Sequence, residues 1–269
     1  MYIARAMWTR KIGSAVVLID SDPARPLQSD DQAALLSEGL LLGQYRIRSY
    51  RKDQVQSHAI SDITYAYITA PAAQAHSQWI LRGIERAECF ADGTNYARDL
   101  TNAPGNLLVP ENLAQEAAKL AERHGFGVEI LDERAIDAEG MGGLYHVGKG
   151  SVNPPRMITL KYQGKPEWED VWGLVGKGIT FDTGGISMKQ PEGMEEMISD
   201  MGGAATLLGF MEIVGRLKPR QNILVVIPSA ENMPSGGALK PGDVIPTLSG
   251  RTVEVLNTDA EAASCWPME

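Results

Sequence analysis

The sequence predicts an α/β protein with a small N-terminal unit and a larger domain built on a mixed, largely parallel sheet flanked by helices. Two observations support this prediction. Short apolar segments typical of buried strands alternate with helical segments along most of the 269 residues, a pattern that indicates a sheet with helices on both faces. One long helical segment separates the first strands from the rest, so we expect it to join two domains.

The N-terminal unit is predicted from two strands and one helix. Residues 13–20, GSAVVLID, form a continuous apolar run before the turn-rich SDPARP, which indicates a buried strand. Residues 30–45 place apolar side chains at helical spacing. A second strand is expected at residues 62–69. Together these elements make a small α/β unit.

The longest helical pattern covers residues 73–100 and predicts the helix that connects the two domains. Its broad apolar face is expected to be formed by Trp79, Ile80, Ile84, Ala87, Phe90 and Tyr96. We place the domain boundary inside this helix, which gives an N-terminal domain of residues 1–84 and a second domain of residues 85–269.

The second domain continues the alternation of strands and helices. A loop punctuated by Pro104 and Pro110 leads into a helix at residues 111–123, which Gly125 ends. Strands are expected at residues 127–132, 157–162, 171–176, 222–230 and 252–257, and a helix at residues 203–216. The segment GGLYHVGKGS resembles a phosphate-binding loop, but Gly150 stands where that loop needs Ser or Thr. We therefore interpret it as a glycine-rich strand and turn.

Composition and charge exclude several classes of protein. The formal charge of -9 and the scattered basic residues argue against a nucleic-acid partner, which needs a basic face. The two cysteines, Cys89 and Cys265, offer neither a disulfide framework nor a metal knuckle and favour a reducing compartment. No stretch reads as a signal peptide or a bilayer span. We expect a cytoplasmic protein without a membrane partner.

Charged residues interrupt otherwise apolar, glycine-rich segments at the ends of predicted strands. Lys177 and Asp182 follow strand 171–176, Asp200 precedes a glycine pair that opens a helix, and Asp259 and Glu261 follow strand 252–257. Functional loops of such sheets lie at the carboxyl ends of the strands. Four carboxylates at one point would repel each other strongly without cations, so the pattern predicts a site for Mg, Mn or Zn.

The two lysines of this region favour a site over isolated turn aspartates. Taken singly, an aspartate before glycine or threonine is most often a turn or capping residue. Lys177 can ligate a metal in its neutral form, because nearby cations disfavour its ammonium form. Lys189 can stay charged and stabilise an oxyanion. Metals that share carboxylates suggest hydrolysis by activated water.

Several long motifs, in order, resemble the leucyl aminopeptidase family (peptidase family M17). They are EGLLLGQYRIRSYRKD, DLTNAPGNLLVPENLA, VGKGITFDTGGISMK, SDMGGAA, PSAENMPSGGALKPGDV and LNTDAE. The resemblance implies a shortened N-terminal α/β domain, a long connecting helix and an incomplete peptidase domain. It also implies a cytosolic homo-hexamer that releases N-terminal amino acids from peptides with a free N-terminus.

The resemblance further implies a role for each charged residue. Asp182 and Glu261 would bridge two divalent ions, Mn or Zn and alternatively Mg. Lys189 would be the catalytic lysine that holds the scissile carbonyl, and Met197 would line the pocket for the first side chain of the substrate. The complete set of metal ligands would be Lys177, Asp182, Asp200, Asp259 and Glu261.

The sequence departs from the family immediately after Glu261, where the family continues Gly-Arg-Leu-Val-Leu-Ala-Asp and this chain reads AASCWPME. Ala263 stands at the position of the arginine that holds the family's bicarbonate. Codons can be chosen for these residues such that insertion of one base gives the family motif, so we expect a frameshift there and an inactive truncated product. The alternative hypothesis is a non-catalytic fragment or pseudoenzyme that retains only part of the fold.

Overall fold

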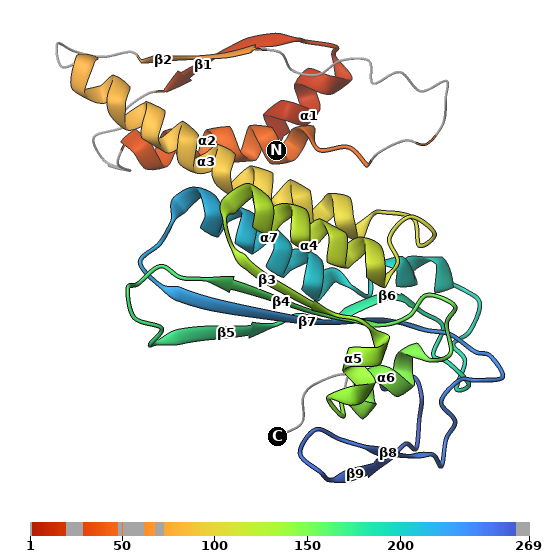
Figure 1. Ribbon diagram of the computed structural model, residues 1–269. Helices are drawn as coiled ribbons and strands as arrows, with labels where there is room; N and C mark the ends of the chain where they lie inside the picture. The colour runs from red at the N-terminus through yellow and green to blue at the C-terminus, as the bar shows by residue number, and fades with distance from the viewer. Residues whose placement is uncertain (1, 20–28, 48–49, 51–61, 68–72, 262–269) are drawn as a thin grey trace. The chain divides into compact units, whose positions relative to one another are not determined.

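The computed structural model describes residues 2–19, 29–47, 50, 62–67 and 73–261 (Figure 1). The positions of Ala263 and Cys265 lie outside the described residues. The chain divides into two compact units, Met1–Asn95 and Tyr96–Glu269. Both this division and the expected boundary after residue 84 fall within helix α3 (Ala73–Thr101), whose expected length is confirmed.

The first unit contains the predicted pair of strands. β1 (Ser14–Ile19) runs parallel to β2 (Asp62–Tyr67), in a register that pairs Ser14 with Asp62. The predicted helix is α2 (Ser29–Gln44), and a further helix that the sequence did not predict, α1 (Tyr2–Thr9), precedes it.

The expected apolar face of α3 is wrong for two of its six residues, Trp79 and Phe90, whereas Ile80, Ile84 and Tyr96 are half-buried. Trp79 and Phe90 are 46% and 38% exposed, whereas Ala87 and Cys89 are buried. A Cβ atom at Gly83 would lie 2.2 Å from the backbone oxygen of Asp30 at the start of α2. The two helices therefore approach closely at Gly83, and no larger residue fits between them at that position.

The second unit is built on a five-stranded mixed sheet in the order β3-β4-β7-β5, with β6 also paired to β7. The pairs β3–β4 and β4–β7 are antiparallel, and β5–β7 and β6–β7 are parallel, so the two orientations are equally represented. The strands are β3 (Gly127–Leu131), β4 (Arg156–Tyr162), β5 (Val171–Val175), β6 (Gly178–Asp182) and β7 (Asn222–Asn232). A short hairpin of β8 (Val244–Pro246) and β9 (Thr252–Glu254) follows.

Helices cover both faces of this sheet, as predicted (Figure 1). On one face lie α4 (Pro110–His124), which Gly125 ends in a left-handed conformation, and α7 (Gly202–Leu217). Their apolar sides and the sheet form the larger core, which includes Leu113, Leu208 and Val225. At one end of the other face, α5 (Glu133–Ala138) and α6 (Gly142–Gly148) pack with the β8–β9 hairpin in a second core.

Helix α6 corrects the interpretation of GGLYHVGKGS, which is helical over Gly142–Gly148 rather than a strand and turn. Two of its glycines serve close packing. A Cβ atom at Gly142 would lie 2.1 Å from the backbone oxygen of Pro246, and one at Gly148 would lie 2.8 Å from the ring of Pro155. Glycine is thus required by neighbouring chain segments, and the helical backbone itself does not need it.

One described segment, Met194–Leu217, is long and apolar enough to cross a membrane, contrary to the expectation of no such stretch. Its C-terminal part is α7, whose side chains Ala204, Leu208 and Met211 are fully buried against the sheet. A helix that buries this face within the domain is a core helix, and its apolar composition follows from that burial.

Candidate metal centre

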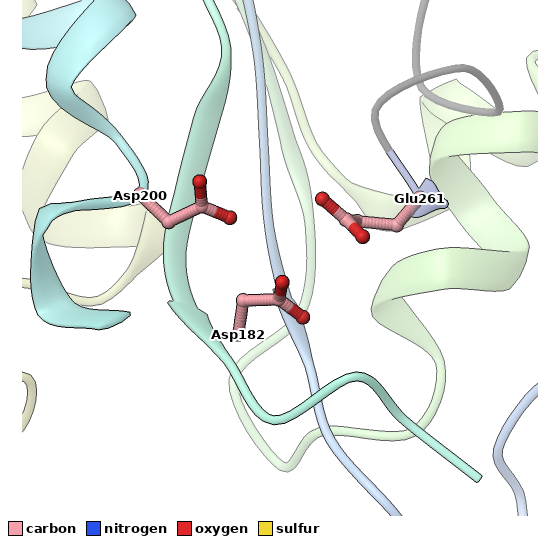
Figure 2. Close-up of side chains that lie close together, drawn as sticks. All are labelled: Asp182, Asp200 and Glu261. Carbon is pink, nitrogen blue, oxygen red and sulfur yellow. The ribbon is translucent and has the colours of Figure 1, made fainter. Parts of the chain in front are cut away.

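Three carboxylates from separate parts of the sequence meet at the carboxyl ends of β6 and β7 (Figure 2). Asp182 ends β6, Asp200 follows the short 3-10 helix Met194–Ser199, and Glu261 lies near the end of the described chain. One oxygen from each lies within 4.8 Å of the others. The residues Asp182 and Glu261 are only 2% and 3% exposed.

Asp182 is held by backbone and side-chain donors. Its Oδ1 accepts hydrogen bonds from Gly184 N and from Asn232 Nδ2, both at 2.9 Å. Gly184 and Gly185 have φ values of 85° and 65°, in the left-handed region that favours glycine. A Cβ atom at Gly185 would lie 2.7 Å from Asn232 Oδ1. This glycine pair therefore brings the backbone onto the carboxylate.

Thr258 joins the segment that carries Asp259 and Glu261 to the loop after β6. Its hydroxyl donates to Gly184 O at 2.7 Å and accepts from Ser187 N at 2.9 Å. Asn232 Nδ2 also donates to Thr258 O at 2.9 Å. Sequence reasoning missed both Asn232 and Thr258. Their signal is a polar residue at a strand end within the motifs SAENMP and LNTDAE.

The two lysines pair with all four carboxylates. Lys177 Nζ lies 2.8 Å from Asp200 Oδ2 and 2.6 Å from Glu261 Oε1. Lys189 Nζ lies 2.9 Å from Asp182 Oδ2 and also contacts Asp259. The structure therefore brings together the five residues predicted as ligands and Lys189.

The pairing keeps both lysines charged. Burial disfavours the ammonium form of Lys177, but its bonds to Asp200 and Glu261 outweigh this effect and raise its pKa. The pKa of Lys189 is raised in the same way by Asp259 and Asp182, again against burial. Burial raises the pKa of Asp200, and Lys177 only partly offsets this. Two ammonium groups thus compensate part of the charge of four carboxylates.

The residues fit a divalent cation. Glu261 Oε2 is buried and has no hydrogen-bond partner among the described residues, although an unpaired buried carboxylate oxygen is costly. It belongs to the group whose oxygens converge within 4.8 Å. Carboxylate oxygens are ligands for Mg, Mn and Zn, and a divalent ion would compensate the remaining negative charge.

Met197 lies in the 3-10 helix three residues before Asp200 and is half-buried. The same helix contacts β6. The predicted pocket residue therefore lies on an element next to the carboxylates.

Known proteins resemble this chain in sequence and in fold. A family model described as the cytosol aminopeptidase family, catalytic domain, matches residues 95–263. Probable cytosol aminopeptidases of Bacillus subtilis and Bacillus licheniformis are 45% and 46% identical over 97% and 91% of this chain. The chain spans about half the length of these curated relatives, 51% and 48%.

Solved structures with the same fold include two of the bottromycin maturation enzyme BotP. One, in complex with Mn, has a TM-score of 0.81 and 33% identity over 97% of this chain and 53% of its own. The cytosol aminopeptidase of Coxiella burnetii has a TM-score of 0.76 and 28% identity over 93% of this chain and 50% of its own.

Proposed function

The chain belongs to the cytosol aminopeptidase family, and on that premise we propose that it forms the metal-binding part of an aminopeptidase that releases N-terminal residues from peptides. The observation that carries this proposal is the group Asp182, Asp200 and Glu261, with one buried oxygen of Glu261 left without a hydrogen bond among the described residues. The ordered contacts of Asn232 and Thr258 hold this group in place.

The proposed ligands of two divalent ions are Asp182, Asp200, Asp259, Glu261 and Lys177. To bind a metal, Lys177 would have to lose the proton that its ion pairs with Asp200 and Glu261 favour in the metal-free chain. Manganese or zinc is the proposed metal, with manganese supported by the related structure solved with that ion. When bound, such ions would lower the pKa of a water molecule and polarise a peptide carbonyl. In the metal-free structure the carboxylates form ion pairs with Lys177 and Lys189.

Lys189 is proposed as the residue that holds the carbonyl oxygen of the substrate. Its raised pKa keeps it protonated at neutral pH, so it can donate hydrogen bonds to a developing oxyanion but cannot act as a base. The bond between Lys189 and Asp182 positions this ammonium group beside the carboxylates. Met197 is proposed to contact the first side chain of the substrate.

The proposed setting is a cytosolic homo-hexamer that acts on peptides with a free N-terminus. A second candidate function is a non-catalytic metal-binding chain. It is supported by the bonds of Lys189 to Asp182 and Asp259, which already occupy the ammonium group that a substrate carbonyl would need.

Metal content and hydrolysis, measured on the same preparation, test both candidates. We expect elemental analysis to find close to two ions per chain after incubation with Mn²⁺ or Zn²⁺ and removal of free ions. Hydrolysis of leucine p-nitroanilide that Lys189→Met abolishes without loss of metal would support the aminopeptidase. Bound metal without hydrolysis would support the second candidate. A chain that holds no metal, although its circular dichroism shows it folded, would contradict both.

A further inference from the structure

A cavity of about 780 Å³ lies beside β6 and β7 and is lined by Phe181 and Glu231. In the register of these strands, Asp182 pairs with Asn232 and Phe181 pairs with Glu231. Successive side chains of a strand point to opposite faces. The first pair belongs to the metal centre and the second lines the cavity.

Glu231 carries a buried carboxylate. The residue is 6% exposed and lines the cavity. No ion pair within the described part of the chain includes it, and it accepts hydrogen bonds from Ser151 Oγ at 2.5 Å and Asn153 Nδ2 at 3.0 Å. Both end on Oε2. A buried carboxylate is costly unless a cation or further donors compensate it.

The loop of residues 150–153, which donates the hydrogen bonds to Glu231 Oε2, is itself held by close contacts. Ser151 Oγ also accepts a hydrogen bond from Asn153 N at 2.9 Å, so its proton points to Glu231. A Cβ atom at Gly150 would lie 2.3 Å from Met233 O, which shows how closely this loop approaches the chain after β7. With Oε2 engaged twice, Oε1 is the oxygen left for a ligand in the cavity.

The chemistry of the cavity walls indicates which kind of cation can bind to this carboxylate. Val109, Phe181, Met233 and Pro234 supply apolar surface. Hard metal ions take six or more oxygen ligands, and one free carboxylate oxygen together with the side-chain oxygens of Asn106 and Ser235 does not supply them. An organic ammonium group with a short aliphatic stem matches both features, because its charge pairs with the carboxylate and its stem contacts the walls.

We propose that the cavity beside Glu231 is a binding site for an alkylammonium group, the chemistry found at the end of a lysine side chain. The site is separate from the metal centre, although both are built on β6 and β7. It does not depend on the proposed peptidase function, because the cavity and the carboxylate exist whether or not the chain hydrolyses peptides.

Isothermal titration with n-butylammonium tests the proposal, with n-butanol as the uncharged probe of the same shape. We expect saturable binding of butylammonium to the chain and none of butanol. Glu231→Gln, which keeps acceptors for Ser151 and Asn153, should weaken binding about tenfold or more. Glu254→Gln, which changes an exposed carboxylate on β9, should leave it unchanged.

Two further variants test whether butylammonium binds in this cavity. Ser235→Trp places a large side chain at the exposed rim of the cavity and should also reduce binding, which keeps the test valid if Glu231→Gln does not fold. Glu261→Gln distinguishes the two carboxylate sites. Butylammonium binding that Glu261→Gln weakens and Glu231→Gln leaves unchanged would place the amine at the metal centre and overturn the proposal, as would the absence of saturable binding.

Discussion

The substitution Glu261→Gln should abolish stabilisation by metal while changing the stability of the metal-free chain little. Glu261 is 3% exposed, and its Oε1 lies 2.6 Å from Lys177 Nζ. It also lies in a group whose oxygens are within 4.8 Å of one another, so it is repelled by Asp182 and Asp200. The glutamine keeps the shape of the side chain and removes its charge.

The magnitudes follow from these contacts. At an effective dielectric constant of about 20, two unit charges 4 Å apart interact by about 4 kcal/mol. Glu261 has one attractive neighbour that is closer than this and two repulsive ones slightly farther away, so the two effects largely cancel. We therefore expect a change of no more than about 1 kcal/mol without metal. With free metal at about 100 times its Kd, the unsubstituted chain should gain about 2.7 kcal/mol.

Urea unfolding followed by circular dichroism, in EDTA and in excess Mn²⁺, measures both quantities. The unsubstituted chain and the matched control Glu254→Gln should gain stability with Mn²⁺, and Glu261→Gln should gain almost none. A full gain in Glu261→Gln would show that Glu261 is no ligand. A large loss of stability of Glu261→Gln in EDTA would show instead that the attraction between Glu261 and Lys177 is stronger than the repulsion from Asp182 and Asp200.

Three other substitutions test the fold around the sheet, each by urea unfolding. Gly215→Ala should cost about 1–3 kcal/mol, because its Cβ would lie 2.2 Å from the ring of His124; an unchanged midpoint would contradict the contact. Leu113→Ala in the fully buried face of α4 should cost about 2–5 kcal/mol, and a loss below about 1 kcal/mol would place this side chain outside the core. Glu111 has a pKa lowered chiefly by its hydrogen bond from Arg156, at 2.7 Å. Its stabilising contribution is therefore present above the unfolded pKa, near 4.3, and is lost as the pH falls through the lower folded value. Glu111→Gln should be less stable than the unsubstituted chain at pH near 7 and equal to it at pH near 2, and a difference that persists in acid would refute this origin.

The sheet could be predicted because its strands are continuous apolar runs separated by glycine and proline. β7, with Ile223, Val225 and Ile227 fully or nearly fully buried, is such a run. β6 was missed, because GITFD is short and directly follows the strand before it. The outward face of α3 was also missed, since helical periodicity does not show that Gly83 needs close contact with α2.

The charged part of the site could be predicted because each carboxylate follows a strand or precedes a glycine pair. The positions of Lys177 and Lys189 between the carboxylates agree with that reasoning. The uncharged residues that orient these groups could not, since Asn232 and Thr258 look like ordinary polar residues at strand ends. Glu231 was missed for a related reason. Its burial and the lack of an ion pair with any described residue are properties of the folded chain, and a glutamate at the end of an apolar strand gives no sign of them.

A single bulge determines which side chains of β6 reach the carboxylate group. Ile179 pairs with Ala230 and Phe181 with Glu231, so Thr180 is the extra residue in β6. Ile179 belongs to the second core, and Asp182, three residues later, would point to the opposite face in a regular strand. The extra residue reverses this alternation and brings Asp182 to the side of Asn232. Without the bulge, Phe181 would enter the carboxylate group and Asp182 the cavity beside Glu231, where two carboxylates would repel each other. The irregularity at Thr180 is therefore what separates the metal centre from the proposed ammonium site on the same two strands.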